Sequence, residues 1–99
     1  MKRNPMAASL KPSAKEIVVE RVQTGVKLEK RMLKVLKALA EYHDMTLGDL
    51  LEGIVLHAFE GKAPFGRTTM ARIGELKRVY GMAYDARASH RLREADSGR

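Results

Sequence analysis

The chain has 99 residues, which is enough for one small domain and too few for two ordinary ones. Its 19 Lys and Arg residues outnumber its 12 Asp and Glu residues, so the net charge of +7 favours a polyanionic partner such as nucleic acid. Cysteine is absent, which excludes disulfides, thiolate metal sites and thiol nucleophiles. No apolar stretch is long enough to cross a membrane, and we expect a cytoplasmic protein.

The charges are segregated along the chain. Residues 1–15 carry four basic residues and no acid, and residues 21–37 carry six basic residues against Glu29 alone. Residues 38–60 carry five acids and no Lys or Arg, and residues 61–99 are basic again. Because a solvated helix face usually mixes both signs, this segregation indicates that some parts of the protein face a polyanion and others face away.

The N-terminal third predicts an arm followed by one strand. Residues 1–15 have no apolar period and are interpreted as a flexible basic arm. Residues 21–28 alternate, with Val22, Val26 and Leu28 on one side, which is typical of a half-buried β-strand. No second β-like run follows, so we expect this strand to pair with the same strand of a second chain.

Apolar residues at helical spacing predict three helices in the rest of the chain. They run from Lys30 to a turn at residues 43–45, from the N-cap Thr46 to Gly61, and from about Thr68 to Tyr80. Gly81 is a predicted stop, and a further short helix and a polar tail follow it.

The order of strand, helix, turn and capped helix in RVQTGVKLEKRMLKVLKALAEYHDMTLGDLLEGIVLHAF resembles the ribbon–helix–helix superfamily, which includes the Arc, MetJ and CopG repressors. The resemblance covers residues 18–60. It implies a mainly helical fold with one β-strand per chain, and an intertwined homodimer whose two-stranded antiparallel ribbon enters the major groove. On this interpretation residues 1–15 form the arm, residues 16–61 the ribbon–helix–helix domain, and residues 62–99 a C-terminal helical extension with a polar tail.

The resemblance places the base-reading residues on the outward side of the ribbon, at Gln23, Gly25 and Lys27, with Arg21 on the same side. A glutamine can bond adenine N6 and N7, and a lysine can donate to guanine O6 and N7. Gly25 departs from the polar residue usual at its position and has no side chain that reads a base. The alternative interpretation is an ordinary solvated strand face.

The resemblance also places a phosphate at the N-terminus of the second helix, at Thr46, Leu47 and Gly48, where first-turn N–H groups have no partner within the helix. Asp49 would repel a phosphate there, so a plain helix cap is the alternative. The other predicted phosphate ligands lie at the start of the first helix and are Lys30, Arg31 and Lys34.

These features predict a sequence-specific transcriptional regulator, a repressor that binds operator DNA as a homodimer and is associated with the nucleoid. One alternative is an antitoxin whose residues 62–99 bind a toxin, and another is a dimeric interaction module without DNA binding. A helix-turn-helix is disfavoured because its second helix, residues 46–60, would face DNA with acids and no Lys or Arg.

No catalytic or cofactor site is expected. The stretch GKAPFGRT at 61–68 has the outline of a phosphate-binding loop, but it follows a helix, contains a proline and lacks the required lysine. His43, His57 and His90 are too far apart in sequence for a local metal motif. We therefore predict a protein that is not an enzyme and holds no metal or cofactor.

Overall fold

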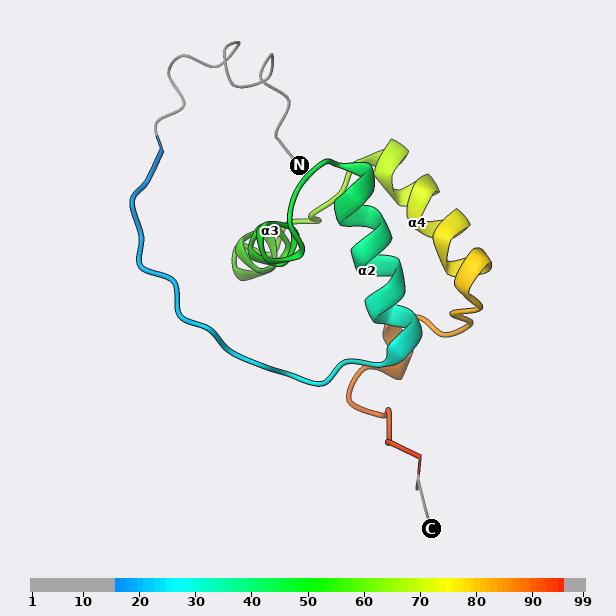
Figure 1. Ribbon diagram of the computed structural model, residues 1–99. Helices are drawn as coiled ribbons and strands as arrows, with labels where there is room; N and C mark the ends of the chain where they lie inside the picture. Colours follow the sequence, from blue (N-terminus) through cyan, green and yellow to red (C-terminus); the bar gives the residue numbers. More distant parts are fainter. Residues whose placement is uncertain (1–15, 96–99) are drawn as a thin grey trace.

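The computed structural model describes residues 16–95, and within this range the protein is helical. Its elements are α2 (Lys30–Tyr42), α3 (Leu47–Phe59), α4 (Arg67–Tyr80) and a short 3₁₀ turn, η1 (Ala86–Ala88). Figure 1 shows α2 in the middle, with α3 on one side and α4 on the other, and α2 packs against both. The acidic helix α3 is thereby held apart from the exposed side of the basic helix α4.

The helix ends follow from local side-chain chemistry. Thr46 caps α3 because its Oγ1 accepts a hydrogen bond of 3.0 Å from the Asp49 N–H. Gly81 ends α4 in the left-handed conformation with φ of 71°, and its N–H donates to the carbonyl of Arg78. The predicted turn at residues 43–45 and the predicted start of the first helix at Lys30 are also confirmed.

The core lies where α2 meets the other two helices. The buried side chains are few, and within the described residues they are Val35, Leu39, Ala40 and Leu50. Half-buried apolar side chains from α2, α3, α4 and their connections complete the cluster around Leu39, namely Leu36, Met45, Ile54, Phe65, Ile73 and Leu76. Residues of the predicted domain at 16–61 and of the predicted extension at 62–99 thus share one small core.

The predicted strand is wrong. Residues 16–29 are neither helix nor strand, and the structure contains no sheet or ribbon among residues 16–95. A strand needs a neighbour that takes up its backbone N–H and C=O groups, and no other described segment offers one. The expected inward side is not buried, because Val22, Val26 and Leu28 are 79%, 75% and 39% exposed.

The ribbon–helix–helix fold class therefore fails as a description of this chain, since that fold requires the strand. In its place residues 16–28 form an exposed, irregular segment, which we call the arm segment. Its backbone curves past α3 and leads into the start of α2 (Figure 1). Residues 1–15, predicted as a flexible basic arm, lie outside the described residues. Among residues 16–95, no helix is long and apolar enough to cross a membrane.

Candidate nucleic-acid interface

A stripe of lysines runs along the exposed side of α2. Lys30, Lys34 and Lys37 are spaced by four and three residues, so they lie on one face of the helix, and all three are exposed. No carboxylate of the described part of the chain lies within ion-pair distance of them. The stripe is about 10 Å long, and over that length one strand of B-DNA carries about three phosphates. We call these three residues the lysine stripe.

The lysine stripe borders α4. The Lys34 ammonium lies 6.0 Å from the centre of the Tyr80 ring, at the outer limit of a cation–π contact. Arg31, the other predicted phosphate ligand on α2, does not share this face. It donates to the Gly81 carbonyl at 3.1 Å and pairs with Glu29, so it joins α2 to the end of α4. We therefore assign Arg31 a structural role.

The predicted base readers all lie on the arm segment and are exposed. Gln23 and Gly25 are exposed, and a Cβ added at Gly25 would meet nothing within 4 Å. Arg21 and Lys27 are engaged by carboxylates of other segments. Arg21 binds Glu52 of α3 through two hydrogen bonds of 2.8 Å, and the Lys27 ammonium lies 3.8 Å from a Glu94 oxygen.

A groove of about 990 Å³ separates the arm segment from the start of α3, and it brings several predicted site residues together. Those residues are Arg21, Gln23 and Gly25 from the arm segment and Thr46, Leu47 and Gly48 from α3. Lys27, Lys30, Arg31 and Lys34 do not line it. The predicted base-reading and phosphate-binding sets are therefore divided between this groove and the surface of α2, and Lys27 lies at neither place.

The lining of the groove does not suit a phosphate. Four carboxylates line it, those of Glu20, Asp44, Asp49 and Glu52, whereas Arg21 is its one cation. The Thr46 side chain is already engaged in capping α3. The predicted phosphate site at Thr46, Leu47 and Gly48 thus keeps its first-turn geometry but lies among negative charges. Valine and leucine side chains from both walls also line the groove, together with the polar side chains of Gln23 and Thr24.

Tyr84, in the segment after α4, contacts Glu29, which joins the arm segment to α2. The Tyr84 hydroxyl donates a hydrogen bond to Glu29, whose carboxylate also caps α2 by accepting from the Met32 N–H. The bond from Tyr84 is the main cause that lowers the pKa of Glu29 to about 2, and the Met32 and Arg31 N–H groups add to it. Burial, and then the bond to Glu29, raise the pKa of Tyr84 to about 12.

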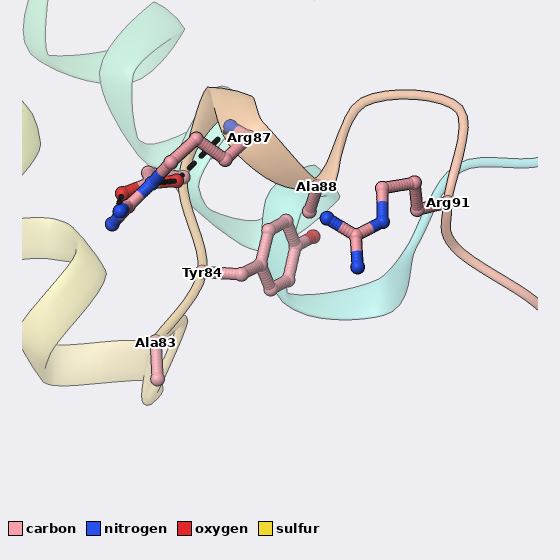
Figure 2. A pocket seen from close by; sticks show the side chains of 6 residues that line it. Ala83, Tyr84, Arg87, Ala88 and Arg91 are labelled. Atoms are coloured by element: carbon pink, nitrogen blue, oxygen red, sulfur yellow. Dashed lines mark hydrogen bonds and ion pairs between the residues drawn. The ribbon is translucent and has the colours of Figure 1, made fainter.

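Figure 2 shows Tyr84 from close by, with the side chain of Arg91 pointing toward its ring and Arg87 joined to Asp85. These residues line a shallow cavity of about 330 Å³. Asp85 accepts from the Arg87 side chain and backbone, which lowers its pKa. Tyr84 therefore holds the segment after α4 against the start of α2, whereas the ion pair of Asp85 and Arg87 lies within that segment.

Replacing Tyr84 with phenylalanine is expected to lower the melting temperature above pH 5. The difference from wild type should disappear in acid. The ordinary pKa of Glu29 is 4.5 and the folded value is about 2, so the stabilisation is complete above pH 4.5 and is lost as the pH falls through 2. Melting temperatures of wild type and Y84F between pH 2 and pH 7 measure the gap. A gap that stays constant between pH 5 and pH 2 contradicts this reading, and Tyr42→Phe, on an exposed tyrosine, is the control.

Sequence reasoning missed two features of this surface. Lys37 belongs to the lysine stripe, and its spacing from Lys30 and Lys34 could have identified it. The contact between Glu29 and Tyr84 joins residues 55 positions apart, and no local pattern indicates it. Within residues 16–95, no cluster of three His, Asp or Glu side chains could hold a metal ion.

Comparisons with protein-family models, with curated proteins and with solved structures found no match for this chain.

Proposed function

We propose that this protein binds duplex DNA and regulates transcription by occupying an operator. The observation that carries the proposal is the lysine stripe, in which three exposed cations share one helix face and none is neutralised by a carboxylate of residues 16–95. Most other cations near the arm segment are paired, as Arg21, Lys27 and Arg31 are. Unpaired lysines at phosphate spacing release counterions when they bind DNA, which favours association.

The proposal assigns different parts of the surface to different tasks. The lysine stripe contacts phosphates, which fixes the position of the protein on the duplex without reading sequence. The exposed arm segment supplies side chains for base edges, with Gln23 suited to adenine and Arg21 and Lys27 suited to guanine. The major groove is about 12 Å wide and admits such a segment without a paired ribbon.

Two titrations test the proposal. Fluorescence anisotropy with a random duplex at several salt concentrations gives the number of phosphate contacts, and a slope of log K against log salt of about −2.7 corresponds to the three lysines. In vitro selection of bound duplexes then tests for sequence preference. Binding that is absent at low salt would refute the function, and binding without a preferred sequence would refute the regulatory part of it.

We also infer that the protein acts as a homodimer. One chain leaves apolar side chains uncovered on the C-terminal half of α3, where Leu56 is 64% and Phe59 82% exposed. A second copy covers them if the C-terminal halves of the two α3 helices pack against each other about a two-fold axis, because such an axis makes each contact twice and leaves the arm segment open. Such a pairing enlarges a core that is small for a stable monomer.

Sedimentation is expected to show a dimer at micromolar concentration for the wild type and a monomer for the double variant Leu56→Asp, Phe59→Asp. Both side chains are exposed in one chain, so the charges disturb the contact between copies rather than the packing of α3. Val79→Asp is the matched control, because Val79 is also an exposed apolar helix residue, but on α4. A monomeric wild type would remove the basis for the dimer.

A further inference from the structure

We propose that Glu52 is a positioning residue that holds Arg21 as a reader of guanine. This inference rests on the proposed function and deepens it, because it names the base and the residue behind the reader. The geometry is specific, since Arg21 donates from Nε to Oε2 and from Nη2 to Oε1 of Glu52, both at 2.8 Å. One side of the planar guanidinium is thereby fixed in a paired contact.

The bonds that remain on Arg21 suit a guanine. A guanidinium carries five N–H donors, and the contact with Glu52 uses one from Nε and one from Nη2. The outer end, made by Nη1 and the second hydrogen of Nη2, keeps two parallel donors. Two parallel donors match O6 and N7 of guanine, which is the commonest specific contact of an arginine in the major groove.

The surrounding charge favours a base edge over a phosphate. Arg21 faces Glu52 and is also influenced by Asp49, and the hydrogen bonds and charge of Glu52 raise its pKa further. Two carboxylates of α3 would repel a phosphate that approaches this guanidinium. A guanine edge carries no net charge, so the same carboxylates would not repel it. The lysine stripe has Glu41 one turn beyond Lys37 but no carboxylate of residues 16–95 within ion-pair distance, so the two surfaces differ in the ligand that each prefers.

The contact with Glu52 also restricts the rotamers of the long Arg21 side chain before DNA binds. The arm segment leaves Arg21 largely exposed, and a free arginine pays for losing its rotamers when it binds. Immobilising such a side chain lowers affinity by about 2- to 12-fold. Because Glu52 already holds Arg21 in the free protein, DNA binding does not incur this loss. Removing Glu52 should therefore weaken binding to the preferred site, although it also removes a negative charge.

The test compares Glu52→Ala with Glu75→Ala. Glu75 is the matched control because it also bonds an arginine at 2.8 Å and has a similar exposure, 53% against 47% for Glu52. The probes are the selected duplex, a random duplex, and the selected duplex with 7-deazaguanine, which lacks the N7 acceptor, at one guanine at a time. We expect Glu52→Ala to lower affinity for the selected duplex about 2- to 12-fold without lowering affinity for the random duplex.

The 7-deazaguanine duplexes identify the contact. Wild type and Glu75→Ala should lose affinity at one guanine of each half-site, and Glu52→Ala should lose less there. Arg21→Lys should abolish that loss, and Glu52→Ala should then have no further effect in the Arg21→Lys background. Glu52→Gln, which retains one acceptor, should fall between wild type and Glu52→Ala.

The outcomes separate the two proposals. If Glu52→Ala binds the selected and random duplexes more tightly by the same factor, Glu52 is only a competing counterion, and the positioning role is overturned while DNA binding stands. If Glu52→Ala and Glu75→Ala behave alike, the role is overturned as well. If the wild type binds no duplex at low salt, the proposed function itself fails.

Discussion

Replacing Lys30, Lys34 and Lys37 together with glutamine is expected to lower the affinity for random duplex DNA by about 500-fold at 0.1 M salt. Each phosphate contact contributes a slope of about −0.9 in log K against log salt, which corresponds to about eightfold in affinity at this salt concentration. The three lysines lie on one exposed face and have no carboxylate partner within residues 16–95, so their full charge is available to DNA. Anisotropy titrations between 50 and 200 mM salt measure both the affinity and the slope.

A triple variant of equal charge loss provides the control. Lys62, Arg87 and Arg93 are also exposed, but Lys62 pairs with Glu60 and Arg87 with Asp85. Replacing these three with glutamine lowers the net charge by the same amount and should leave the slope nearly unchanged. If both triple variants lose the same affinity, the overall charge of the protein determines binding, and the lysine stripe is not a site.

The helices could be predicted from the sequence because local chemistry determines them. A threonine that caps with its own hydroxyl, as Thr46 does, acts on backbone three residues away. Gly81 adopts a positive φ that most residues with a side chain avoid, and this ends α4 whatever that helix packs against. That α4 packs against α2 was not predicted, since an apolar stripe at Ile73 and Leu76 shows which face of the helix is buried but not against what.

The strand was predicted wrongly for a physical reason. Alternation of apolar and polar residues from Arg21 to Leu28 describes side chains, whereas a strand is defined by backbone pairing with a neighbour. The described chain contains no neighbour, and the alternating valines stay exposed. The pattern of period two therefore indicated an apolar side of the segment, but it did not show which other segment, if any, buries that side.

The candidate site was predictable only where its residues are close in sequence. Lys30 and Lys34 are one helical turn apart, and their place on one face follows directly from their spacing. Arg21 and Glu52 are separated by 31 residues, so no spacing rule pairs them. The long-range contacts are the ones that local spacing misses, and the partner of Arg21 could not be named from the sequence.

Replacing Leu39 with alanine is expected to destabilise the protein by about 2–5 kcal/mol, the largest effect on stability from one side chain. Leu39 is 1% exposed and lies at the centre of the cluster between α2, α3 and α4. Shortening it removes apolar contacts and leaves a cavity that its neighbours fill only in part. Small domains have about 5–15 kcal/mol in total, so this loss brings the variant close to unfolding.

Urea denaturation of both proteins at one concentration measures this loss, because a dimer makes the midpoint depend on concentration. Val79→Ala is the control, since Val79 lies on α4 but is 72% exposed and should change stability by less than about 0.5 kcal/mol. Similar midpoints for Leu39→Ala and Val79→Ala would mean that Leu39 is not central to the core. A large shift in Leu39→Ala alone would show that the packing of α2 against α3 and α4 depends on this one side chain.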